Sequence, residues 1–203
     1  MTVGVLLSGS GTNLQALIDQ ADGYRIGVVI SNRRDAFGLE RARQAGIPAV
    51  WVPHRGRSRE EFEQALTDTL AQHDVSWVAC AGFMRILTAH FLDAWPHRVL
   101  NIHPALLPAF PGVDGQGQAH VHGVRIAGCT VHFVDAGTDT GPIIAQGAVP
   151  VLQDDDRDAL QQRILQKEHR LYPMCLRMAV QGRLRVEGRK VFVKLNEGES
   201  LLV

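Results

Sequence analysis

The chain has 203 residues, of which 45% are hydrophobic and 21% charged, as in an ordinary globular protein. Lysine and arginine (21) balance aspartate and glutamate (21), so no charged surface for nucleic acid or membrane is indicated. The three cysteines stand far apart and predict neither a disulfide framework nor a CxxC pair. Since the sequence also lacks a secretory pattern and an apolar run of roughly 18 residues, we expect one cytoplasmic domain over residues 1–203.

Short apolar runs alternate with amphipathic stretches over the first hundred residues. Apolar runs at 3–7, 25–30 and 48–52 are followed by helical patterns at 12–21, 35–46 and 58–73. The apolar runs are continuous, as in strands that helices cover on both faces. They therefore predict βα units and a parallel sheet, with Ser58 as the N-cap of the third helix.

The rest of the chain adds strands and one long helix. Strands are predicted at 76–83, 97–103, 127–134 and 142–151, a helix from about 156 to 180, and a hairpin at 183–193 that turns at Glu187 and Gly188. We therefore expect an α/β, Rossmann-like fold. Its sheet is mostly parallel, with helices on both faces and an antiparallel C-terminal portion.

A glycine-rich turn, "SGSGTN", lies between the first predicted strand and helix. Glycines allow a tight turn, and the free amides of a helix start form an anion site. The spacing matches neither GxGxxG nor a P-loop, and no lysine follows. The turn predicts a phosphate site or a plain βα connection, and the local sequence leaves both open.

Polar side chains mark the end of the strand in "LNIHPALLP". Asn101 and His103 share one strand face, since side-chain direction repeats every two residues, and Pro104 ends the ladder. An asparagine can donate to a developing oxyanion, and a histidine can move a proton near neutral pH. A single histidine near a proline turn is more often structural, so the local sequence favours that interpretation.

A second polar turn, "DAGTDTG", follows the strand that contains His132. Aspartates in loops commonly cap turns, and His132 can be a packed residue with a satisfied ring. If Asp139 lies beside His103, its charge favours the imidazolium form. His120 and His122 lack a third ligand at metal-site spacing, so no metal is expected. The local sequence around Glu168 and His169 predicts that both lie on an exposed helical face.

Taken together, these stretches resemble the glycinamide ribonucleotide formyltransferases of purine biosynthesis. The residues that carry the resemblance are "LLSGSGTNLQAL", "SNRRDAFGLERARQAGIP", "AGFMRIL", "LNIHPALLPAFPG", "TVHFVDAGTDTGPII" and "EHRLYP", nearly end to end. The resemblance implies direct transfer of formyl from 10-formyltetrahydrofolate, as co-substrate, to the amine of 5'-phosphoribosylglycinamide, without a metal. It also implies a phosphate-binding half at 1–100 and a catalytic and folate-binding half at 101–203.

The resemblance also implies roles for individual residues. Asn101, His103 and Asp139 form the catalytic set. Gly11, Thr12 and Asn13 hold the ribonucleotide phosphate, and Glu168 lies near the substrate amine, against the local reading of an exposed face. The folate is held by Arg59, Met84, Arg85, Ile86, Leu87, Asn101, Asp135, Ala136, Gly137, Thr138 and Asp139.

Other formyl-folate enzymes and other classes stay as alternatives. A methionyl-tRNA formyltransferase adds a C-terminal RNA-binding domain and a formyltetrahydrofolate deformylase an N-terminal regulatory domain, for which 203 residues leave no room. A nicotinamide oxidoreductase lacks support, because Ser31 and Asn32 stand where a ribose-binding acid is expected. A non-catalytic nucleotide-binding module remains open. We expect small-molecule substrates, no nucleic acid, no membrane, and a monomer or homodimer.

Overall fold

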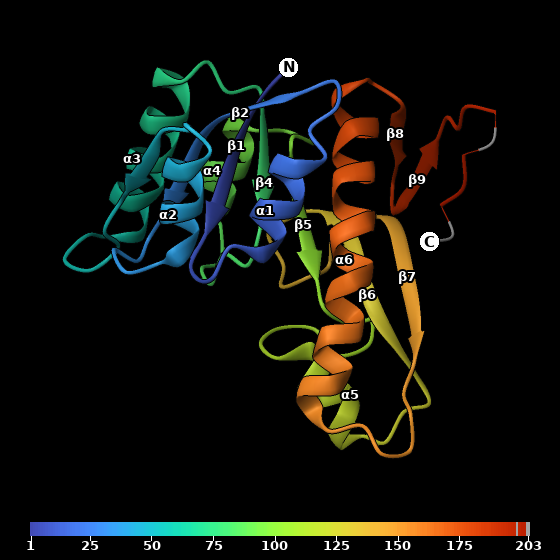
Figure 1. Ribbon diagram of the computed structural model, residues 1–203. Helices are drawn as coiled ribbons and strands as arrows, with labels where there is room; N and C mark the ends of the chain where they lie inside the picture. The colour runs from blue at the N-terminus through green and yellow to red at the C-terminus, as the bar shows by residue number, and fades with distance from the viewer. Residues whose placement is uncertain (198, 202–203) are drawn as a thin grey trace. The chain divides into compact units, whose positions relative to one another are not determined.

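A computed structural model describes residues 1–197 and 199–201 (Figure 1). The chain divides into two compact units, Met1–Asn101 and Ile102–Val203. Each unit is built around its own strands and helices, and we describe them in turn.

The first unit is a run of βα elements. They are β1 (Thr2–Leu7), α1 (Thr12–Asp19), β2 (Arg25–Ser31), α2 (Phe37–Gln44), β3 (Ala49–Trp51), α3 (Arg59–Gln72), β4 (Trp77–Cys80), α4 (Ala89–Ala94) and β5 (Val99–His103), whose last two residues belong to the second unit. The strands lie in the order β3-β2-β1-β4-β5. Each neighbouring pair in this order is parallel, so the carboxyl ends of all five strands share one edge.

Helices cover both faces of this parallel sheet. The chain moves from β1 outward to β2 and β3, then returns to β4 and β5 on the other side of β1. Because crossovers between parallel strands are right-handed, this reversal puts α1 and α2 on one face and α3 and α4 on the other. Accordingly, α1 packs beside α2 and α3 beside α4 (Figure 1). Buried on both sides, β1 carries the fully enclosed residues Val3, Val5, Leu6 and Leu7.

The start of α3 is a capping box. The Ser58 side chain accepts a hydrogen bond from the Glu61 amide at 3.1 Å, and the Glu61 carboxylate accepts from the Ser58 amide at 2.7 Å. The predicted N-cap is therefore confirmed, and the glutamate that completes the box stands three residues later.

We expect Ser58→Ala to lower the free energy of unfolding by about 1 kcal/mol, because the Glu61 amide loses its side-chain acceptor and the capping box is broken. Urea denaturation measures this change. Ser58→Asp, which keeps an acceptor at the cap, serves as the matched control and should stay close to wild type. Equal midpoints for Ser58→Ala and wild type would contradict the cap's contribution.

The second unit contains mainly antiparallel strands and a long helix. Its further elements are α5 (Gly115–Val121), β6 (Ile126–Phe133), β7 (Ile143–Pro150), α6 (Arg157–Val180), β8 (Leu184–Glu187) and β9 (Lys190–Val193). The strand pairs β6–β7 and β8–β9 are antiparallel, whereas β7 and β9 are parallel. Helix α6, orange in Figure 1, packs along β6 and β7.

The predicted fold class is confirmed, with two helices added. Parallel strands, helices on both faces and antiparallel C-terminal strands are all present. Helices α4 and α5 were not predicted, because α4 has only six residues and α5 contains Gly115 and Gly117, which are poor helix formers. Within residues 1–197 and 199–201, no helix is long and apolar enough to cross a membrane.

Candidate active site

A histidine and an aspartate meet at the end of β5. The strand ends at His103, as predicted from Pro104, and the imidazole is buried. Its Nδ1 lies 3.4 Å from Oδ2 of Asp139, in the turn after β6. The structure thus brings together two side chains that stand 36 positions apart in the printed sequence.

The turn that carries Asp139 is shaped by its other aspartate. The Asp135 carboxylate accepts from the Gly137 amide at 3.1 Å and from the Thr140 hydroxyl at 2.6 Å. Asp139 itself adopts a left-handed backbone with φ of 54°, which aspartate tolerates better than most residues. The Asp135 carboxylate therefore stabilises the turn, and the Asp139 carboxylate faces the histidines.

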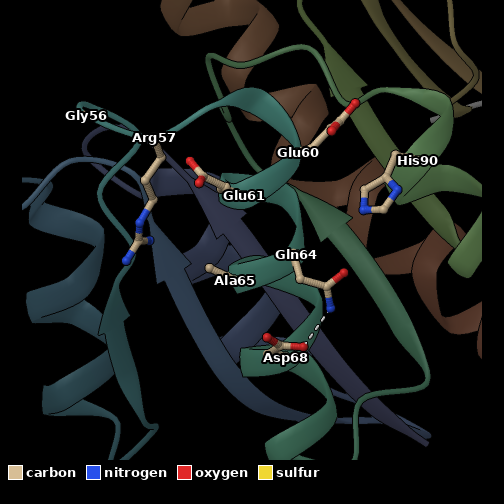
Figure 2. Close-up of a pocket in the computed structure, with 8 residues that line it drawn as sticks. All are labelled: Gly56, Arg57, Glu60, Glu61, Gln64, Ala65, Asp68 and His90. Atoms are coloured by element: carbon tan, nitrogen blue, oxygen red, sulfur yellow. Dashed lines mark hydrogen bonds between the residues drawn. The ribbon is translucent and has the colours of Figure 1, made fainter.

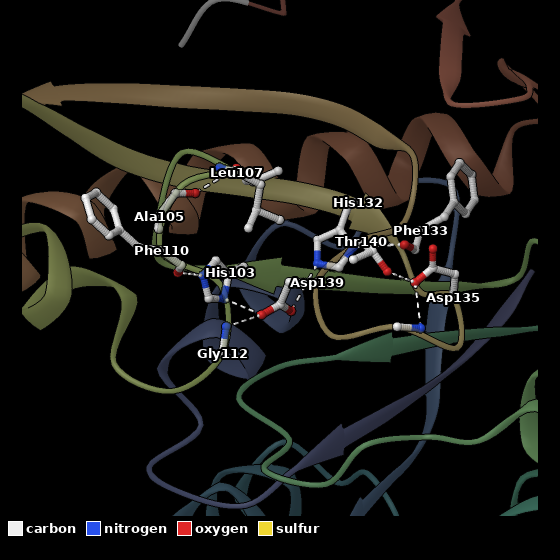
Figure 3. Close-up of polar contacts among 12 residues, drawn as sticks. His103, Ala105, Leu107, Phe110, Gly112, His132, Phe133, Asp135, Asp139 and Thr140 are labelled. Atoms are coloured by element: carbon white, nitrogen blue, oxygen red, sulfur yellow. Dashed lines mark hydrogen bonds and ion pairs between the residues drawn. The ribbon is translucent and has the colours of Figure 1, made fainter.

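Asp139 lies between two imidazoles and a main-chain amide (Figure 3). Its Oδ2 accepts from the Gly112 amide at 2.7 Å, and its Oδ1 is 3.7 Å from Nε2 of His132. Burial by itself raises the pKa of Asp139, but the polar interactions with His132 and Gly112 and the charge of His103 outweigh it and hold the pKa below its ordinary value. Asp139 is therefore a carboxylate at neutral pH.

The protons of His103 follow from what its two nitrogens face. Nε2 is 2.8 Å from the Phe110 carbonyl oxygen, which can only accept, so Nε2 carries a proton. Nδ1 faces the Asp139 carboxylate, which favours a proton there as well. A Cβ at Gly115 would come within 2.9 Å of Nε2, so glycine leaves room for the ring. Both ring nitrogens of His103 thus face oxygen atoms that can accept a hydrogen bond.

His132 is a further member of this cluster, although its sequence context predicts only a packed strand residue. It is buried on β6, and its Nδ1 is 2.8 Å from the Phe133 carbonyl oxygen, which leaves Nε2 toward Asp139. Its position is the signal that could have found it, because His132 is the last residue but one of a strand that leads into the polar turn with Asp135 and Asp139.

The lowered pKa of Asp139 predicts how acid acts on stability. A carboxyl group with a depressed folded-state pKa contributes stability above its unfolded pKa, near 3.8, and loses it as the pH falls through the folded value. We therefore expect the stability difference between wild type and Asp139→Asn to shrink below pH 4. Urea unfolding of both proteins from pH 3 to pH 6 measures it, and a difference independent of pH would contradict the shift.

The glycine turn after β1 is held tightly against α2. Gly11 is the N-cap of α1 with φ of 73°, and a Cβ there would lie 2.6 Å from the Gly38 Cα, so both backbone angle and space require glycine. The Gly38 amide donates to the Gly9 carbonyl at 3.1 Å. Among the residues that the structure describes, no side chain caps α1. The first amides of α1, with Thr12 and Asn13, thus form the start of a rigid helix that suits an anion.

The remaining predicted residues have definite places. Met84, Arg85 and Ile86 are exposed in the segment after β4, Leu87 is buried, and Arg59 is the exposed first residue of α3. Glu168 is buried on α6 with 5% exposure, so the prediction from the local sequence that it lies on an exposed helical face is wrong. Burial raises the pKa of the Cys129 thiol on β6 to about 12, and the Glu168 carboxylate adds to the rise, so Glu168 lies near β6.

The two neighbouring histidines near α5 are engaged separately. Nε2 of His120 is 2.9 Å from the Asp155 carbonyl oxygen, and Nδ1 of His122 is 3.0 Å from that of Gln118. Over the described part of the chain, no group of three histidine, cysteine or acidic side chains is placed to hold a metal.

An open hollow of about 640 Å³ lies along α3 in the first unit (Figure 2). Its lining residues are Gly56, Arg57, Glu60, Glu61, Gln64, Ala65, Asp68 and His90. None of them is a predicted site residue. Glu61 is occupied in the capping box and Gln64 donates to Asp68 at 2.8 Å, so these groups serve the helix itself.

Fold and site together define a class of protein: an α/β enzyme with a doubly wound parallel sheet and a histidine–aspartate pair, suited to proton transfer, at the end of a strand. The chain belongs to the formyl transferase family, whose model matches residues 1–176.

Relatives and solved structures agree with this family. The chain is 41% identical to phosphoribosylglycinamide formyltransferase from Escherichia coli, over 92% of this chain and 90% of the relative. Glycinamide ribonucleotide transformylase 1 from Symbiobacterium toebii has 52% identity and a TM-score of 0.93, covering 95% of this chain and 93% of that one. Trifunctional purine biosynthetic protein adenosine-3 from Drosophila melanogaster is 50% identical over 89% of this chain, which spans only 14% of that relative's length.

Proposed function

We propose that this protein transfers the formyl group of 10-formyltetrahydrofolate to the amine of 5'-phosphoribosylglycinamide, in purine biosynthesis. The observation that carries the proposal is the buried His103, held between Asp139 and the Phe110 carbonyl in a chain of the formyl transferase family. A cationic imidazole at this place can stabilise negative charge and supply a proton.

The reaction needs one new bond, one broken bond and two proton movements. The substrate amine attacks the formyl carbon and forms a tetrahedral oxyanion, toward which Asn101 and His103 act as donors. When the carbon–nitrogen bond to folate breaks, the folate nitrogen gains a proton and the former amine nitrogen loses one. His103 assists this exchange directly or through water, and no net charge is left on the enzyme.

The proton that His103 supplies is the one on Nε2. In the structure this N–H donates to the Phe110 carbonyl at 2.8 Å, so delivery requires that hydrogen bond to be exchanged for one to the substrate or to water. Asp139 stays ionised at neutral pH and faces Nδ1 throughout, which keeps the ring oriented and stabilises its charge.

Substrate binding is assigned to the residues that the family resemblance marks. Gly11, Thr12 and Asn13 hold the ribonucleotide phosphate at the start of α1, where no side chain of the described residues caps the helix. Glu168 lies near the amine of the ribonucleotide. The folate is held by Arg59, by residues 84–87 with two exposed apolar side chains, by Asn101, and by the turn from Asp135 to Asp139.

Release of tetrahydrofolate tests the function directly. Purified protein mixed with 10-formyltetrahydrofolate should release tetrahydrofolate only when 5'-phosphoribosylglycinamide is present. Release without the ribonucleotide would indicate hydrolysis of the formyl-folate instead. Binding of both ligands without release of tetrahydrofolate would favour a non-catalytic binding module and contradict the proposed transfer.

A further inference from the structure

The segment after β4, residues 82–88, combines an exposed apolar surface with a firmly held main chain. Met84 is 67% exposed and Ile86 is 54% exposed, so this short segment displays two large apolar side chains. Such side chains usually pack inward, and their display on a fixed backbone suits contact with a flat apolar ligand. Buried polar side chains from other elements hold the segment at both ends.

Ser8 holds the first end. Its hydroxyl accepts from the Met84 amide at 2.9 Å and donates to Oδ1 of Asn32 at 2.6 Å, while the Ser8 amide donates to the Gly82 carbonyl at 3.0 Å. Because the hydroxyl has a single hydrogen, donation to Asn32 turns its lone pairs toward Met84. Ser8 and Asn32 are both buried, with exposures of 3% and 6%.

Asn32 is itself held by His54, three residues beyond the end of β3. Nδ1 of His54 lies 3.3 Å from the Asn32 carbonyl oxygen and 3.4 Å from its Nδ2. Asn32 follows β2, Ser8 follows β1, and Met84 lies beyond β4, so the contacts join the carboxyl ends of three neighbouring strands. The position of Met84 is therefore tied to the centre of the sheet.

Glu63 holds the second end. Glu63 is 1% exposed, and its carboxylate accepts from both the amide, at 2.8 Å, and the hydroxyl of Thr88. Its neighbour Phe62 stacks on Phe83 at a ring distance of 6.4 Å. Burying a carboxylate is costly unless it is well hydrogen-bonded, and these bonds go to the residue that ends the segment.

We propose that Ser8, Asn32 and Glu63 are positioning residues, which hold residues 82–88 in the shape that receives the folate. This inference rests on the proposed function, in which Met84 to Leu87 contact that ligand. A binding segment that is already ordered before the ligand arrives loses less conformational entropy on binding. The three residues act through the main chain of the segment and do not touch the folate.

Steady-state kinetics with Ser8→Ala and Glu63→Ala test the inference. Each change leaves a main-chain amide of the segment without its acceptor, and we expect KM for 10-formyltetrahydrofolate to rise about tenfold. KM for the ribonucleotide should stay within about twofold of wild type, since neither change alters Gly11, Thr12 or Asn13. Glu63→Gln retains one acceptor oxygen and should fall between Glu63→Ala and wild type.

Asn32→Ala acts through the same hydroxyl as Ser8→Ala. The double variant should therefore raise the folate KM less than the product of the two single effects. Hydrogen exchange at the Met84 and Thr88 amides provides a measurement that does not depend on turnover. Loss of protection in Ser8→Ala and Glu63→Ala, respectively, would show that the intended contacts were removed in folded protein.

Ser76→Ala and Gln64→Ala are matched controls, because each removes a side-chain hydrogen bond in the same unit whose two partners lie outside residues 82–88. Both should keep the wild-type folate KM. An unchanged folate KM in Ser8→Ala and Glu63→Ala, despite lost amide protection, would overturn the inference. An equal rise in both KM values would also overturn it. Absence of transfer in the wild type is a different result and overturns the proposed function.

Discussion

We expect Asp139→Asn to lower turnover by about 10²-fold or more, the scale of a general acid–base contribution. The amide has nearly the same size as the carboxylate but no charge, so it leaves His103 without its facing anion. It also presents an amide nitrogen to a pocket in which the Gly112 amide and two imidazoles already point at the carboxylate. Initial rates of tetrahydrofolate release at saturating substrates measure the effect.

Urea denaturation at neutral pH distinguishes loss of charge from loss of structure. If Asp139→Asn remains folded but turns over slowly, the variant has lost the anion that faces His103 and not its fold. Asp158→Asn changes an exposed carboxylate of the same unit in the same way and should keep wild-type turnover. Near-normal turnover of Asp139→Asn would show that His103 works without this charge.

The first unit follows from local sequence to a large extent. Continuous apolar runs at 3–7 and 25–30 form β1 and β2 because both faces of each strand are covered. Ser58 caps α3 because its hydroxyl accepts from the Glu61 amide, and the Glu61 side chain adds the reciprocal hydrogen bond. Helix α4 of this unit and helix α5 of the second unit cannot be predicted in the same way, because their local sequence signal is weak. Six residues, or seven with two glycines, carry too little periodicity to stand out, and tertiary packing decides them.

The candidate site was only partly predictable. Strand geometry puts Asn101 and His103 on one face, but the 3.4 Å contact to Asp139 depends on how β6 ends and on a left-handed residue in the turn. Glu168 shows the limit of local reasoning most clearly: its neighbours suggest an exposed face, whereas α6 packs along β6 and β7 and buries it. Contacts between distant segments decide such positions.

Buried polar residues were the hardest class to recognise. His132, Ser8 and Asn32 look like ordinary strand-end residues in the sequence, and their partners lie on other strands or loops. From the sequence, Ser31 and Asn32 indicate only that the acid expected for a ribose hydroxyl is absent after β2. In the structure Asn32 orients Ser8, because its amide oxygen accepts the Ser8 hydroxyl hydrogen. The same hydroxyl oxygen then accepts from the Met84 amide.

We expect Asn101→Ala to lower kcat by about 10²- to 10³-fold, the loss typical of removing one donor to a developing oxyanion. The residue lies on β5 two positions before His103, where its amide projects from the same strand face as the imidazole. Since the oxyanion exists only after the amine has attacked, KM for both substrates should change much less than kcat. Full progress curves for wild type and variant measure both quantities.

Asn101→Asp is the matched variant because it keeps the size of the side chain and replaces the donor amide with an oxygen that only accepts. A carboxylate facing a developing oxyanion repels it, so this variant should be slower than Asn101→Ala, although it fills the space better. If Asn101→Asp retains more activity than Asn101→Ala, the side chain acts by filling space rather than by donating. Near-normal kcat in both variants would remove Asn101 from the oxyanion site and leave that charge to His103.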